Sequence, residues 1–204
     1  DPGHPVGDHL RRLSHSARLA LVLMALSLLA ACGDSGVPTG GPLATIGTPD
    51  PHPCDLLSFD DASGVLGVEV TGADRSDADP TNGWQAACTW AGADPGVALD
   101  VLVEGPAFFE QASAGYQDSP AAYHFWRDDA LQAGFSVVDV EAVGDAAFLP
   151  VIGEGPLNTM VMRSGDYLVH LALLGPGGEA QLTAAARLVA AALDRYRESV
   201  PAGS

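Results

Sequence analysis

The sequence predicts an α+β fold, a twisted antiparallel sheet flanked by helices and preceded by a signal peptide and a disordered tether. Three observations support this prediction. Several segments in the middle and later parts of the chain alternate apolar and polar residues and are separated by Gly, Pro and Asp turns, as strands are. An alanine-rich segment near the C-terminus repeats apolar residues at helical spacing. A short apolar run follows three arginines near the N-terminus.

The N-terminal apolar run is residues 19–32, LALVLMALSLLAAC. It is too short to cross a bilayer, which needs about 20 apolar residues, and therefore indicates a secretion signal. Its end, Leu29-Ala30-Ala31-Cys32, resembles a bacterial lipobox, in which a peptidase cuts before a cysteine that carries diacylglycerol. We expect residues 1–31 to be a lipoprotein signal peptide and Cys32 to be acylated, for example with palmitate. An ordinary secreted protein and a buried helix are the alternatives.

The lipid on Cys32 would decide the location of the protein. Two acyl chains hold a protein stably on a membrane, whereas one gives only marginal binding, and a diacylglyceryl group supplies two. The predicted location is therefore extracytoplasmic, anchored by lipid to the outer face of the cell membrane. Residues 32–53 form the predicted tether, because they are rich in Gly, Pro, Ser and Thr and have no apolar period. His52 is expected to be solvated there.

The charge of the chain excludes some partners. Without residues 1–31 it carries six arginines against 24 acids, a formal net charge of −18. Such a surface repels phosphate backbones and anionic lipid head groups, so we expect no nucleic-acid partner and a membrane contact through lipid alone. The chain has no lysine, which excludes a P-loop and a Schiff-base mechanism.

No catalytic motif stands out in the sequence. Residues 111–115, QASAG, lack the first glycine of the serine-hydrolase elbow, and the metalloprotease, P-loop and dinucleotide-binding motifs are absent. A glycosidase pair of carboxylates stays open, since only their separation in space defines it. The acidic loop 71–83 departs from the calcium-binding EF-hand pattern, because counting from Asp77 its twelfth position is Cys88 instead of Glu. We expect no enzyme, no cofactor and no metal.

Two cysteines remain after Cys32, namely Cys54 and Cys88. An even pair in an exported chain predicts a disulfide, which would close a loop of about 35 residues. Zinc binding is the competing interpretation, but neither cysteine belongs to a CxxC pair and no HxxxH lies nearby.

A single α+β lipoprotein domain is expected over residues 54–199. Its predicted elements are, in chain order, a helix over 59–66 capped by Ser58 and ended by Gly67, a brief strand at 68–70, a hairpin of strands 84–90 and 97–103, a short helix over 105–116, a helix from its N-cap Ser119 to Gly134, a strand over 135–143, a hairpin of strands 158–163 and 167–174, and a C-terminal helix with apolar residues from Leu182 to Tyr196. The strand 167–174, YLVHLALL, is nearly all apolar and is therefore predicted to be central. The C-terminal helix is predicted to cover one face of the sheet.

Four aromatic residues are the weak candidates for ligand binding: Phe108, Phe109, Phe125 and Trp126. A ligand module would use them to line a dry concave pocket. A scaffold would bury them and expose an apolar patch elsewhere. For the aromatic cluster of the second predicted helix, Tyr123, His124, Phe125 and Trp126, a core stripe is the plainer interpretation. His170 is expected to be a core histidine hydrogen-bonded to the backbone.

Several short motifs together resemble a known family. They are Cys54-Asp55-Leu56-Leu57, Cys88-Thr89-Trp90, the segment VGDAAF at 143–148, and a hairpin that leads to an alanine-rich helix. In this combination they resemble the actinobacterial exported lipoproteins that are grouped only as a domain of unknown function. The resemblance covers about residues 54–197 and implies a fold similar to the PsbP-like α/β/α sandwich. It implies no activity and offers no catalytic residues.

The predicted function follows from the predicted cellular location and from the absence of a catalytic motif in the sequence. We expect a membrane-anchored extracytoplasmic lipoprotein with a non-catalytic binding or scaffold role at the cell envelope, whose partner is an unidentified envelope protein. The alternative is a small-ligand or lipid-binding module of the envelope.

Overall fold

The structure, a computed structural model, describes residues 50–77, 85–111, 116–152, 155–156 and 158–200. All the described residues belong to one compact unit, Ile46–Ser204. The predicted signal peptide, Cys32 and most of the predicted tether lie outside the described residues. None of the helices within the described ranges is long and apolar enough to pass through a bilayer.

The described part of the chain forms helices and strands in mixed order. Their bounds are α2 Pro53–Leu56, α3 Phe59–Leu66, β1 Val70–Ser76, β2 Gln85–Gly92, β3 Ala98–Glu104, α4 Pro106–Gln111, α5 Ser119–Gln132, β4 Ser136–Asp139, β5 Ala146–Ile152, β6 Gly155–Pro156, β7 Thr159–Ser164, β8 Tyr167–Leu174 and α6 Glu179–Ser199.

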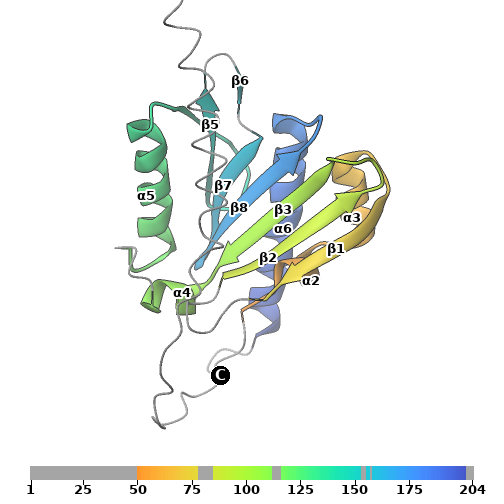
Figure 1. Ribbon diagram of the computed structural model, residues 1–204. Coiled ribbons are helices and arrows are strands. Elements are labelled where there is room, and N and C mark those ends of the chain that lie inside the picture. Colours follow the sequence, from red (N-terminus) through yellow and green to blue (C-terminus); the bar gives the residue numbers. More distant parts are fainter. Residues whose placement is uncertain (1–49, 78–84, 112–115, 153–154, 157, 201–204) are drawn as a thin grey trace, which may run out of the picture. The chain divides into compact units, whose positions relative to one another are not determined.

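The strands form one antiparallel sheet (Figure 1). Their order is β1-β2-β3-β8-β7-β5-β4, and β6 pairs with β5. This arrangement confirms the predicted α+β fold with an antiparallel sheet flanked by helices. Both predicted hairpins are present, since β2 pairs with β3 and β7 with β8. The strand β8 lies in the middle of the order, as its nearly continuous apolar sequence predicts.

Helices pack on both faces of the sheet (Figure 1). We call the face that packs on α2, α3 and α6 the α6 face, and the face that packs on α5 the α5 face. Alternation along β8 assigns its side chains: Val169 and Leu171 join the core on the α6 face, whereas Leu168 joins the core on the α5 face. The helix α5 contacts β4, β7 and β8, and no described helix covers the α5 face of β1 and β2.

The helix α3 begins and ends where the sequence predicts. The Ser58 side chain accepts a hydrogen bond from the Asp61 N–H at 3.1 Å, and the Asp61 carboxylate accepts one from the Ser58 N–H at 3.1 Å. This reciprocal pair satisfies two N–H groups that the first turn leaves without helical partners. The helix stops at Gly67, whose φ of 69° favours glycine.

The N-cap of α5 differs from the prediction by one residue. Asp118, not Ser119, is the cap, and its carboxylate accepts a hydrogen bond from the Ala121 N–H at 2.8 Å. Ser119 is buried, and its hydroxyl instead donates to the Gly165 carbonyl at 2.7 Å, in the turn between β7 and β8. The prediction was wrong because an adjacent carboxylate takes the capping role and leaves the hydroxyl for a distant turn.

Three strands, β1, β5 and β6, were not predicted as the structure has them. Residues 70–76 form the edge strand β1, although 68–70 was predicted as the strand and 71–83 as a loop. Its polar sequence hides it, because an edge strand with an exposed face needs few apolar residues. The strand β5 and the two-residue strand β6 were not predicted, and β5 contains Pro150, a residue that is unfavourable within a strand. Pro150 lies beyond Phe148, the last β5 residue that pairs with β7, so its missing N–H costs that ladder nothing.

The expectation that His52 is solvated is wrong, because its side chain is only 7% exposed. The ring caps α2, with Nδ1 accepting a hydrogen bond from the Cys54 N–H at 3.1 Å. Its other nitrogen, Nε2, lies 3.2 Å from the Ser76 carbonyl of β1. The imidazole therefore holds the start of the domain against the sheet.

The predicted disulfide is present between Cys54 and Cys88. It joins α2 to β2, with the two Cα atoms 5.2 Å apart. Cys88 and Trp90 are each 1% exposed and belong to the core on the α6 face, as their shared strand face predicts. The helix α6 covers the same face, which confirms the prediction for the C-terminal helix.

Candidate functional site

The four predicted ligand candidates come from two helices that border the α5 face. Phe108 and Phe109 belong to α4, and Phe125 and Trp126 belong to α5. Tyr116 joins them: its ring centroid lies 6.1 Å from that of Phe109 and 5.3 Å from that of Phe125. The short helix predicted to reach Tyr116 already ends at Gln111. We call these five aromatic residues the ring cluster.

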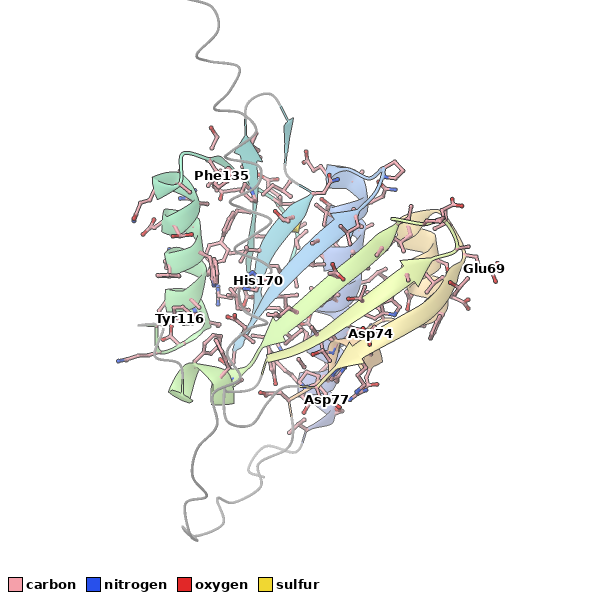
Figure 2. All side chains as sticks on the ribbon, in the orientation of Figure 1. Glu69, Asp74, Asp77, Tyr116, Phe135 and His170 are labelled. Atoms are coloured by element: carbon pink, nitrogen blue, oxygen red, sulfur yellow. A yellow bond between two sulfur atoms is a disulfide. The ribbon has the colours of Figure 1, made fainter. Side chains whose placement is uncertain are left out.

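The ring cluster reaches the sheet through Trp126. The centroid of its ring lies 5.7 Å from that of Phe125 and 5.0 Å from that of His170 on β8. The Trp126 and His170 rings stand nearly perpendicular, at 81°. Edge-to-face geometry of this kind is favourable for aromatic pairs. Figure 2 shows His170 between the sheet and α5, and Tyr116 near the end of α5 that faces α4.

The members of the ring cluster differ in exposure. Phe108 and Phe109 are 7% and 4% exposed and are core residues, whereas Phe125 is 45% exposed. Among the grooves that border the described residues, two have volumes of about 440 and 550 Å³, and no member of the ring cluster lines either of these. Of the cluster predicted as a core stripe, Tyr123 is buried and Phe125 is exposed. A binding role for Phe125 and Trp126 stays a prediction.

The sequence of α5 explains why Phe125 faces solvent. Its buried residues follow helical spacing, with Ser119, Ala122, Tyr123 and Ala130 on one stripe. Phe125 lies off this stripe, whereas Trp126 lies beside it and is half-buried. A helix with so narrow an apolar stripe can present a large ring at the surface without losing its packing on the sheet.

A buried carboxylate lies beneath the ring cluster. Glu104, the last residue of β3, is 2% exposed, and its Oε1 atom lies 3.7 Å from His170 Nε2. The two residues meet because β3 and β8 are neighbours, with Glu104 opposite Leu168 and Leu102 opposite His170. Buried charges are costly unless they are paired, so this pair is a polar centre in an otherwise apolar layer.

The buried carboxylate of Glu104 contributes to a raised pKa of Tyr116. Burial raises the pKa of Tyr116 to about 12, and the negative charge of Glu104 adds to this rise. The nearby indole of Trp126 offsets part of it, although its N–H makes no hydrogen bond of regular geometry within the described chain. The tyrosine hydroxyl therefore stays protonated and can act as a donor.

The prediction that the His170 ring hydrogen-bonds to the backbone is wrong. No backbone group among the described residues hydrogen-bonds to its ring, and the side chain is 25% exposed. Its buried Nε2 faces Glu104 and makes no hydrogen bond within the described ranges. Sequence reasoning missed Glu104 and Tyr116 altogether. Strand alternation does place Glu104 on the face opposite Val101 and Val103, and an acid on a buried face is a signal that could have found it.

The described residues contain no group of three or more His, Cys, Asp and Glu side chains that could hold a metal ion. The site therefore offers rings for stacking, two ring N–H groups and a buried carboxylate, which suits binding. No protein-family model matches the chain, and no curated protein matches it.

Proposed function

We propose that this chain is an extracytoplasmic lipoprotein, anchored through Cys32, whose domain binds another component of the cell envelope without catalysis. The observation that supports the binding role most is the position of the exposed Phe125. It lies on α5, and beyond α5 no described helix covers the same sheet face at β1 and β2. An exposed aromatic residue beside a sheet face without a described helix over it is a typical anchor for a protein partner.

The proposed location of the protein, on the outer face of the membrane, rests mainly on the sequence. The lipobox-like end of the apolar run, the Gly- and Pro-rich residues 33–53 and the disulfide between Cys54 and Cys88 are mutually consistent with an exported chain. The resemblance to actinobacterial lipoproteins of unknown function points to the same address.

The experiment compares two exposed phenylalanines. Phe125→Ala and Phe59→Ala remove side chains that are 45% and 51% exposed, on α5 and on α3 respectively. After cross-linking in the cells that make the protein, we expect the Phe125→Ala chain to lose its cross-linked partner. The Phe59→Ala chain, altered on the helix that packs on the other sheet face, should keep it. Equal retention by both variants would contradict a docking surface at α5.

A small-ligand module is the second candidate, and the polar atoms beneath the ring cluster favour it. Among the described residues, the buried ring N–H of Trp126 and the buried Nε2 of His170 make no hydrogen bond of regular geometry. Leaving buried polar groups unsatisfied costs about 1 to 3 kcal/mol each, which a bound ligand would recover. Native mass spectrometry of the purified full chain tests this candidate, because a stoichiometric bound small molecule that is lost in Trp126→Phe would favour it.

A further inference from the structure

The larger of these two grooves is not lined by any member of the ring cluster. It has a volume of about 550 Å³ and is bordered by the start of α2, by Arg75 of β1 and by the last turns of α6. Small-ligand sites commonly have volumes of roughly 300 to 1,000 Å³. Leu56, Ala192 and Tyr196 supply apolar surface to the groove.

Two of the polar groups that line the groove are already engaged in holding the fold. The His52 ring nitrogens contact the Cys54 N–H and the Ser76 carbonyl. The Arg75 guanidinium lies between two carboxylates, with Asp55 at 3.2 Å and Asp77 at 3.0 Å. These groups have little capacity left for a ligand.

Two other charged groups on the same groove are not paired with each other. Asp50 has a buried oxygen, Oδ2, that makes no hydrogen bond within the described chain. Burial raises the pKa of this carboxyl, and a hydrogen bond with Tyr167 partly offsets the rise. Arg195 is exposed, and no described carboxylate lies within ion-pair distance of its guanidinium. Its positive charge makes a small contribution to lowering the pKa of Asp61.

Gly105 makes the position of Asp50 possible. A side chain at Gly105 would overlap the Asp50 carboxylate, so the absent side chain leaves room for that carboxylate against the end of β3. A buried carboxylate without a cation and a guanidinium without an anion therefore border one groove. A ligand that carries both opposite charges would satisfy both groups.

We propose that this groove binds a small zwitterion, whose ammonium group pairs with Asp50 and whose oxyanion pairs with Arg195. Guanidinium binds carboxylate and phosphate oxygens through two parallel hydrogen bonds, which gives the contact geometric specificity. A purely anionic ligand would be repelled by the chain's net charge of −17, and a purely cationic one would leave Arg195 without a partner. The chemistry fits a free amino acid and equally the ethanolamine head group of a phospholipid. The inference goes beyond the proposed function and holds whether or not Cys32 is lipidated.

Calorimetric titration of the full chain tests the zwitterion directly. The probes are L-leucine, its carboxylate half 4-methylpentanoate, its amine half 3-methylbutylamine, and O-phosphoethanolamine. We expect at least one of the two zwitterions to bind at least about tenfold more tightly than either half, because each half loses one charge-assisted contact. Equal binding of both zwitterions and the halves, or no binding of any probe, would overturn the proposal.

Substitutions test whether Asp50 pairs with the ammonium group of the zwitterion and Arg195 with its oxyanion. Arg195→Gln removes an exposed guanidinium, so the fold should persist, and we expect zwitterion affinity to fall at least about tenfold. Asp50→Asn should weaken the zwitterion and leave binding of 4-methylpentanoate unchanged. Arg187→Gln on the same helix borders the other groove and is the matched control, which should bind as the parent does. Unchanged zwitterion affinity in Arg195→Gln would refute the assignment even if Asp50→Asn fails to fold.

The source of the zwitterion is settled with vesicles. The Cys32→Ala chain, which has no lipid anchor, is sedimented with vesicles of phosphatidylethanolamine or of phosphatidylcholine. Binding to the first alone, lost in Arg195→Gln, identifies the phospholipid head group. Binding of free L-leucine without vesicle binding identifies a dissolved amino acid. If neither source binds, the groove is not a zwitterion site.

Discussion

The two faces of the sheet are built on different principles. The α6 face buries one continuous apolar layer, which includes Leu182, Val189 and Leu193 of α6, all 0% exposed. The α5 face buries aromatic rings around a carboxylate and a half-buried histidine, Glu104 and His170, and leaves Phe125 at the surface. A continuous apolar layer stabilises the fold, whereas a carboxylate buried within a layer gives up stability that an apolar side chain would supply. The α6 face also holds polar groups, but Asp50 borders the groove at its edge and the buried Ser164 is uncharged. The contrast leads us to expect that stability comes chiefly from the α6 face, and it places the proposed binding role on the α5 face.

The largest expected effect compares the same substitution on the two helices. Leu182→Ala on α6 removes a fully buried side chain and should lower the free energy of unfolding by about 3 to 5 kcal/mol. Leu131→Ala on α5 removes a side chain that is 47% exposed, and should change the free energy of unfolding by less than about 0.5 kcal/mol. Urea unfolding followed by circular dichroism measures both. Similar losses in the two variants would break the contrast between the faces.

The disulfide should be the next largest contribution on the α6 face. Replacing Cys54 and Cys88 together by serine opens a loop closed over a sequence separation of 34 residues. The free energy of unfolding should fall by about 3 kcal/mol, because the unfolded chain regains conformational freedom. The control is the parent protein unfolded in a reducing agent, which should match the double variant. A parent that loses no stability on reduction would contradict this prediction.

The cap of α3 should give a smaller and pH-dependent effect. Ser58→Ala removes the side chain that caps α3 and should cost about 1 kcal/mol at pH 7. Hydrogen bonds from Ser58 lower the pKa of Asp61 below its ordinary value of 3.8, so this stabilisation is complete above that value and is lost as pH falls through the lowered pKa. Unfolding measured at pH 7 and in strong acid should therefore show the parent and variant converging in acid. A constant difference at both pH values would exclude the Asp61 contribution.

The smallest effect concerns the buried charge of the α5 face. Glu104→Gln keeps the shape of the side chain and removes its negative charge, so the pKa of Tyr116 should fall from about 12. It should stay above 10, because burial is the larger cause of the rise. Absorbance of tyrosinate during alkaline titration measures it, with Tyr116→Phe identifying which transition belongs to this residue. A transition that does not move would show that Glu104 carries no charge near Tyr116.

Local patterns in the sequence predicted the parts of the fold that depend on neighbours along the chain. Alternation identified β3, a nearly continuous apolar run identified β8, and the Ser58 and Gly67 signals bounded α3. The polar edge strand β1 and the proline-containing β5 were missed, because tertiary pairing overrides their weak local preferences. The contact of Glu104 with His170 could not be predicted, since it depends on which strands are neighbours, and residues 66 positions apart meet only through the register of β3 on β8. The groove between α2 and α6 could not be predicted from the sequence for the same reason.

The measurement that tests the account most directly is the intact mass of the protein isolated from the membranes of the cells that make it. We predict a chain that starts at Cys32, carries at least two acyl chains, and gains two hydrogens on reduction as the bond between Cys54 and Cys88 opens. A chain recovered from the medium without lipid, with an unmodified cysteine at position 32, would contradict the anchored lipoprotein and leave a secreted domain.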